Sequence, residues 1–161
     1  MNYIKKILFS AALLLFMATS NCFARSFDGE EVVSFARFIN DLVNTSQTSR
    51  RGVLCVLGND EIGKILFELD KSIIDLDKIK KYELCKAIYV AQSKEKNVRE
   101  ELIKFNKSKI LTIAVFDNFT EIGGVVRVDI GRRNFELTVN SNDMREFGIK
   151  FNSLAMSLII N

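Results

Sequence analysis

The sequence has 161 residues, which suits one domain with a sizeable core, and a formal net charge of only +3. It contains no histidine, which removes the commonest general base, the usual Ser and Cys catalytic triads and most catalytic zinc sites. The weak positive charge gives no reason to expect nucleic acid as a partner. We therefore expect a protein without enzymatic activity, cofactor or bound metal.

Residues 1–24 have the pattern of a cleavable secretory signal peptide. Two lysines precede an apolar stretch over residues 7–18, which is shorter than the ~20 residues that a membrane-spanning helix needs. Residues 22–24 place small side chains where a signal peptidase reads, so we expect cleavage after residue 24. Lipidation of Cys22 is the alternative, but residues 19–21 lack the Leu and the small residue that such a site prefers.

Export has consequences for charge and for the cysteines. Cleavage would leave residues 25–161 as one domain with a net charge of about +1, because Lys5 and Lys6 leave with the signal peptide. Cys55 and Cys85 remain. An even pair of cysteines in an exported protein favours a disulfide, and two buried free thiols are the alternative. The expected location is a compartment outside the cytoplasm that favours disulfides.

The first part of this domain alternates helices and strands. Asp28 followed by Glu31 resembles a capping box, and apolar residues then recur at helical spacing. The expected elements are a helix over about 29–44, a loop over 44–51, a strand over 53–57, a helix capped by Asn59 or Asp60 that ends near 70, a weak strand over 73–76, a stronger strand over 85–91, a helix from Ser93 to about 105 and a strand over 109–117.

The C-terminal part contains a predicted antiparallel hairpin. Apolar and polar residues alternate over 126–130 and again over 135–139, on either side of a short turn. Ser141 is then expected to cap a short helix that Gly148 ends, and 153–160 to form a final apolar helix. The pattern predicts an α/β fold: a single compact domain with a mixed sheet, helices packed on it, and a C-terminal antiparallel hairpin followed by helices.

Gly58, which follows the strand over 53–57, raises the alternative of a phosphate-binding turn. A dinucleotide-binding fingerprint needs three glycines through the turn and the start of the helix. Here only Gly58 and Gly63 are present, and the Lys-Ile pair after Gly63 completes no P-loop either. We interpret Gly58 as the residue that permits a tight turn from strand to helix.

Three further features could suggest a site. The acid pairs Asp60/Glu61 and Asp75/Asp77 lack further ligands at a useful spacing, so we interpret them as solvated charges rather than a metal site. Phe119 lies in a polar loop and is a candidate partner contact if it is exposed. Burial in the core is the alternative, because Phe is usually buried.

Residues 123–159 combine several motifs in one order. They contain a Gly-Gly pair before a strand, an aromatic residue and a Val-Asn pair on the next strand, and two further pairs in the closing segments: Gly123-Gly124, Phe135, Val139-Asn140, Gly148-Ile149 and Leu154-Ala155. This set resembles the ending of the YfiR-like family of periplasmic proteins. The upstream segments that resemble the family, in the same order, are EEVVSFARFINDLV, LCVLGND, CKAIYVA and ILTIAVFD. The sequence departs from the family at residues 44–45, where Asn-Thr replaces the usual Trp-Pro, and it lacks a second cysteine pair that some relatives carry.

The resemblance implies that the strands carrying Cys55 and Cys85 are neighbours, as a disulfide between them requires. Such a bond would close a loop of about 30 residues and contribute ~3 to 4 kcal/mol of stability. A redox-sensing role is a narrower alternative, because it requires an exposed and strained bond.

The resemblance also implies a function. Such proteins bind the periplasmic sensor region of an inner-membrane diguanylate cyclase and hold the enzyme inactive, which lowers cyclic di-GMP output. Association of two copies into a homodimer is a further alternative. The alternatives are a periplasmic binding module for a small molecule or a peptidoglycan fragment, which predicts a concave apolar pocket, and a secreted enzyme that works without histidine.

Overall fold

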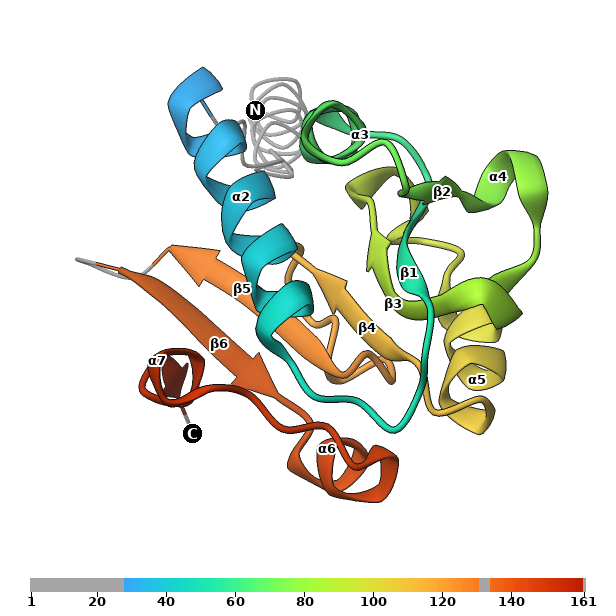
Figure 1. The fold of residues 1–161 in the computed structure, drawn as a ribbon, viewed down its shortest axis with the longest axis vertical. Coiled ribbons are helices and arrows are strands. Elements are labelled where there is room, and N and C mark those ends of the chain that lie inside the picture. The colour runs from blue at the N-terminus through green and yellow to red at the C-terminus, as the bar shows by residue number, and fades with distance from the viewer. Residues whose placement is uncertain (1–27, 131–133, 161) are drawn as a thin grey trace, which may run out of the picture.

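The computed structural model describes residues 28–130 and 134–160, and the predicted signal peptide lies outside these ranges. Within them, one seven-stranded sheet has the order β2-β1-β3-β4-β5-β6-β7. Helices cover the sheet, so the α/β architecture is confirmed (Figure 1). The strands are β1 (Val53–Leu57), β2 (Ile74–Asp75), β3 (Cys85–Val90), β4 (Leu111–Ala114), β5 (Val126–Ile130), β6 (Phe135–Val139) and β7 (Ile159–Ile160).

The sheet is mixed. Strands β2, β1, β3, β4 and β5 run parallel to one another, β6 is antiparallel to β5, and β7 is parallel to β6. The predicted antiparallel hairpin is confirmed, with Val126 opposite Val139 and Ile130 opposite Phe135. The carboxyl ends of the parallel strands meet at one edge of the sheet, where loops and helix termini gather.

The first helix begins as its sequence predicts. The Asp28 side chain accepts a hydrogen bond from the Glu31 N–H at 2.8 Å, and the Glu31 carboxylate accepts one from the Asp28 N–H. The helices are α2 (Gly29–Thr45), α3 (Glu61–Leu69), α4 (Leu76–Ile79), α5 (Arg99–Lys107), α6 (Ser141–Phe147) and α7 (Ser153–Met156), with 3-10 turns at Tyr82–Leu84 and Gln92–Lys94.

The hydrophobic core lies on both faces of the sheet. Alternate residues of β1 enter different clusters, with Leu54 and Val56 on the face covered by α2 and α3. Cys55 and Leu57 lie on the other face, among side chains from α4 and α5. This two-sided burial is the reason that the central strands are apolar throughout rather than alternating.

The structure corrects the predicted final helix. Helix α7 ends at Met156, and the last residues form β7 beside β6. The Leu137 N–H of β6 donates to the Leu158 carbonyl at 2.8 Å, so pairing with an open sheet edge replaces the helical continuation. An apolar run this short fits either conformation, and only the tertiary partner decides between them.

Two predicted helix starts are also wrong. Helix α5 begins at Arg99, not near residue 93, because the Ser93 hydroxyl accepts a hydrogen bond from the Asn59 N–H at 2.9 Å instead of capping a helix. Helix α6 is capped by Asn140, whose side chain accepts a hydrogen bond from the Asp143 N–H. In both cases the helix start depends on which side chain accepts the hydrogen bond of a particular backbone N–H group.

Candidate functional site

The two cysteines of the expected domain are joined by a disulfide. Their Cα atoms are 5.8 Å apart and they are separated by 30 positions in sequence. The bond can form because β1 and β3 are adjacent, with Val53 opposite Cys85 and Cys55 opposite Ile88. Both cysteines are completely buried on the α4 and α5 face. This position does not provide the exposed bond that the redox-sensing alternative requires.

The side chain of Arg50 forms hydrogen bonds with the backbone near this disulfide. Its guanidinium donates to three backbone carbonyls: Cys85 at 3.0 Å, Ser108 at 2.9 Å and Glu83 at 2.8 Å. The planar fork of an arginine can satisfy three acceptors in a fixed geometry, which a lysine cannot do. One side chain therefore connects the start of β3 to the end of α5. The sequence shows only an arginine in a polar loop, so this role could not be predicted.

Gly58 makes the tight turn that the sequence predicts. Its φ is +93°, and a Cβ there would lie 2.6 Å from Lys94 Cγ and 2.8 Å from Ser93 Oγ. Its N–H donates to a carboxylate oxygen of Asp77 at 3.1 Å. Side chains of the protein therefore fill the space beside this turn, and the Gly58 N–H is already hydrogen-bonded to Asp77.

Asp60 connects three elements at the same edge of the sheet. Its side chain caps α3 by accepting from the Gly63 N–H, and also accepts from the Tyr89 hydroxyl at 2.8 Å and the Gln92 N–H at 2.9 Å. Burial, together with the charge and hydrogen bond of Asp60, raises the pKa of Tyr89 well above its ordinary value of 10. This acid has a positioning role in the fold rather than being a freely solvated charge.

The carboxylates of the second acid pair, Asp75 and Asp77, also form hydrogen bonds and ion pairs. Asp75 caps α4 by accepting from the Asp77 and Lys78 N–H groups, and it forms an ion pair with Lys78 at 2.9 Å. Partial burial raises the pKa of Asp75, but the hydrogen bonds and charge of Lys78 outweigh it and leave this pKa below its ordinary value. Asp77 forms an ion pair with Lys94 at 2.8 Å.

Phe119 requires a correction. Its side chain is completely buried, and its ring meets that of Phe116 edge-on at a centroid distance of 5.1 Å. It is buried because the loop folds back, with the Gly124 N–H donating to the Phe119 carbonyl at 2.8 Å. A Cβ on Gly124 would lie within 2.3 Å of the ring. The condition of exposure is not met, so the alternative interpretation, burial of Phe119 in the core, is the one that the structure supports.

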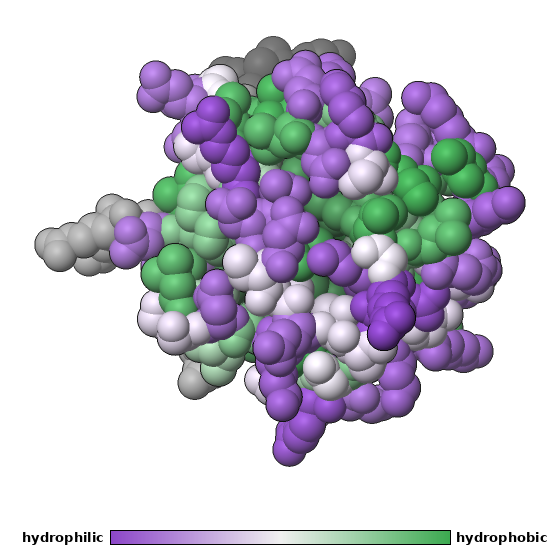
Figure 2. Space-filling model, viewed as in Figure 1, coloured by the Kyte–Doolittle hydropathy of each residue, from purple (hydrophilic) through white to green (hydrophobic). Residues whose placement is uncertain are grey.

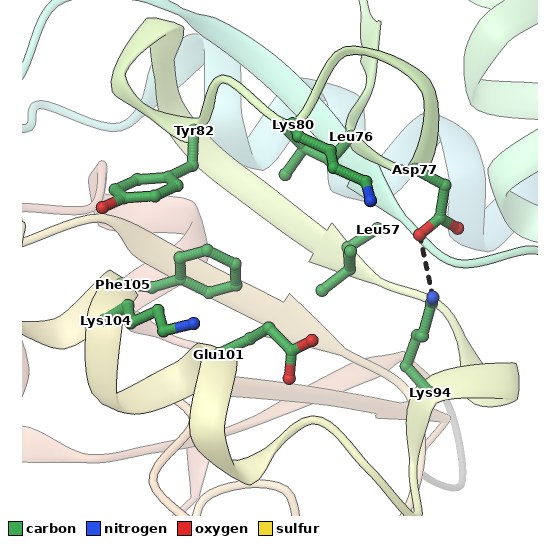
Figure 3. A pocket seen from close by; sticks show the side chains of 9 residues that line it. All are labelled: Leu57, Leu76, Asp77, Lys80, Tyr82, Lys94, Glu101, Lys104 and Phe105. Atoms are coloured by element: carbon green, nitrogen blue, oxygen red, sulfur yellow. Dashed lines mark hydrogen bonds and ion pairs between the residues drawn. The ribbon is translucent and has the colours of Figure 1, made fainter.

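A pocket of about 370 Å³ opens between α4 and α5 (Figure 3). Its inner wall is apolar, and charged side chains surround its mouth. No sequence pattern indicated it, because its residues come from four separate segments. The lining residues are Leu57, Leu76, Asp77, Lys80, Tyr82, Lys94, Glu101, Lys104 and Phe105.

A second, shallower groove of about 540 Å³ lies at the C-terminal end of the described chain. It is lined by residues of α6, α7 and the last two strands, including Val139, Met144 and Ile159. Beside it, Leu154, Met156 and Ile160 are 70%, 52% and 44% exposed. In Figure 2, apolar atoms are present on the surface at the lower left, where α7 lies.

Two kinds of feature are absent from residues 28–130 and 134–160. None of the helices there is both long and apolar enough to cross a membrane. Among the same residues, no group of three or more histidine, cysteine, aspartate or glutamate side chains is placed to hold a metal ion.

The comparisons with known proteins concern both sequence and fold. No curated protein matches the sequence significantly. A conserved domain protein from Vibrio cholerae O1 biovar El Tor has a similar fold, with a TM-score of 0.58 and 11% sequence identity over 80% of this chain and 58% of that one. The family model described as YfiR/HmsC-like matches residues 29–158, which include almost every element of the described fold. The chain therefore belongs to the YfiR/HmsC-like family.

Proposed function

We propose that this protein is a non-enzymatic periplasmic regulator that binds the sensor region of an inner-membrane diguanylate cyclase and keeps the enzyme inactive. The observation that carries the proposal is the family match over residues 29–158. Members of the YfiR/HmsC-like family are known as periplasmic regulators of diguanylate cyclase signalling, a regulatory rather than a catalytic role. The match spans almost every element of the described fold rather than one motif.

The disulfide supports the proposed compartment. Disulfides persist in the periplasm and are rare in the cytosol, and the Cys55–Cys85 bond joins two neighbouring strands of the sheet, β1 and β3. The signal peptide predicted over residues 1–24 would deliver the chain there.

Repression requires that the regulator bind the inactive cyclase better than the active one. A cyclase that is balanced between the two states becomes about 99% inactive when the preference is roughly 100-fold, which corresponds to about 3 kcal/mol. A few well-buried apolar contacts supply a difference of this size.

The surface around α7 and β7 is best suited to such contacts. Leu154 and Met156 are exposed apolar side chains of α7, and Met156 lines the C-terminal groove. Among the described residues, β7 pairs only with β6, so its outer edge is open to a strand of a partner. We therefore assign the cyclase contact to this face.

The test combines binding and output. The tagged mature protein should capture a membrane diguanylate cyclase from host membranes, and deletion of its gene should raise cyclic di-GMP. The variant Leu154→Ser/Met156→Ser should keep its fold but lose both effects. Ile103→Ser is the matched control, because Ile103 is similarly exposed at 53% but lies on α5. Failure to capture a cyclase, together with unchanged cyclic di-GMP in the deletion strain, would overturn the proposal.

A further inference from the structure

We propose that the pocket between α4 and α5 binds a small anionic amphiphile, a compact apolar body that carries a single carboxylate or phosphate group. This inference does not depend on the regulatory function, since it rests on the shape and charge of one part of the domain. At about 370 Å³, the pocket is at the lower end of the range for small-molecule sites. A peptidoglycan disaccharide with its peptide is too large for it.

The inner wall of the pocket is made of core side chains. Leu57, Leu76 and Phe105 are only 7%, 4% and 3% exposed, and the Tyr82 ring meets Phe105 edge-on at 5.7 Å. These residues belong to the hydrophobic cluster that contains the disulfide. The wall is therefore held by β1, α4 and α5 together, and an apolar group that enters would cover surface that the fold leaves open.

The charges at the mouth favour an anion. Asp77 and Lys94 neutralise each other in an ion pair at 2.8 Å. The side chains of Lys80 and Lys104 form no ion pair or hydrogen bond with any described residue, and Glu101 is the one remaining acid of the lining. In Figure 3 the two lysine side chains extend toward the space between the helices. Two unpaired ammonium groups and one carboxylate give the opening of the pocket a net positive charge, whereas its inner wall is apolar.

The backbone fixes the position of one of these lysines. Lys80 ends α4 in the left-handed conformation, with φ +46°, where glycine or asparagine is usual. Its N–H donates to the Leu76 carbonyl and closes the helix. The side chain of Lys80 is thus directed from a fixed turn and not from a mobile loop.

The test uses four probes with the same kind of body and different charge. These are 4-phenylbutyrate, 4-phenylbutyl phosphate, 4-phenylbutan-1-ol as the neutral control and 4-phenylbutylamine as the cationic control. Amide chemical shifts of the mature protein should change around residues 76–80 and 101–105, with the anions binding more tightly than the alcohol and the amine binding most weakly. The preference between butyrate and phosphate then identifies the anionic group.

Charge variants test the mechanism. Lys80→Gln and Lys104→Gln should each weaken binding of the anions by about three- to tenfold, and Glu101→Gln should strengthen it. Lys107→Gln is the matched control, because Lys107 is an exposed lysine of α5 outside the lining. The proposal is overturned if no anion binds at millimolar concentration, if the alcohol binds as well as the anions, or if Lys107→Gln weakens binding as much as Lys104→Gln.

Discussion

The double variant Cys55→Ala/Cys85→Ala opens a loop whose ends are 30 residues apart in sequence. The chain-entropy expression for this loop gives about 12 cal/mol/K, or about 3.6 kcal/mol at 25 °C. Because both side chains are completely buried, loss of the sulfur atoms adds roughly 1 kcal/mol from weaker packing. The sum is a large share of the 5 to 15 kcal/mol that usually stabilises a domain. We expect the melting temperature to fall by roughly 10 to 15 °C.

Urea unfolding followed by circular dichroism measures this loss in the mature protein. Wild type should lose about 3 to 4 kcal/mol when reductant is added, whereas the double variant should not respond to reductant. Thiol counting in unfolded, non-reduced wild type should find no reactive thiol. Two reactive thiols would refute the bond, and a reductant effect below about 1 kcal/mol would refute the entropic argument for its contribution.

Three other perturbations test the surroundings of the bond and the two faces of the core. Arg50→Lys should destabilise the domain by about 2 kcal/mol in urea unfolding, because lysine keeps the charge but donates from a single nitrogen, whereas three nitrogens of Arg50 each reach a different carbonyl. A loss no larger than that of an exposed arginine variant would contradict this. Gly124→Ala should cost about 1 to 3 kcal/mol because its Cβ would meet the Phe119 ring, whereas Gly29→Ala, with nothing within 4 Å, should be neutral or stabilising. Because its pKa is raised in the folded state, the Tyr89 hydroxyl stays protonated to a higher pH there than in the unfolded state. Its contribution to the free energy of unfolding is therefore complete below pH 10 and decreases as pH rises above that value. Tyr89→Phe should therefore show a flatter fall in stability above pH 10, and identical slopes in the two proteins would exclude the effect.

Sequence periodicity predicts the elements that are determined locally. The first helix is one of these, because its cap and its apolar stripe lie within residues 28–43 and need no partner to be recognised. The hairpin is another, since the alternation of apolar and polar residues fixes the face of each strand and therefore limits the register. Both were predicted within one residue of their observed bounds.

The missed features depend on residues that are distant in sequence. Strand β7 exists only because β6 has an open edge, and nothing within residues 153–160 indicates that edge. The α4–α5 pocket combines Leu57 with Lys104, whose chain positions are far apart. The burial of Phe119 depends on a glycine five residues later that leaves room for its ring. In each case the sequence shows which side chains are present, but their role depends on neighbours that only the tertiary structure brings close.

The two proposed sites lie at opposite ends of the sheet, and this separation makes their relationship measurable. The pocket contacts β1 beside the β2 edge, whereas the α7 and β7 face forms the other edge. If ligand binding in the pocket signals release of the cyclase, the anion must lower the affinity for the cyclase by some factor, typically about 5- to 150-fold for coupled sites. Linkage then requires that the cyclase lower the affinity for the anion by the same factor. Calorimetric titrations of 4-phenylbutyrate into the free protein and into its complex with the cyclase sensor region measure that factor. Equal affinities would show that the pocket does not control the partner, because a ligand that binds both states equally shifts neither.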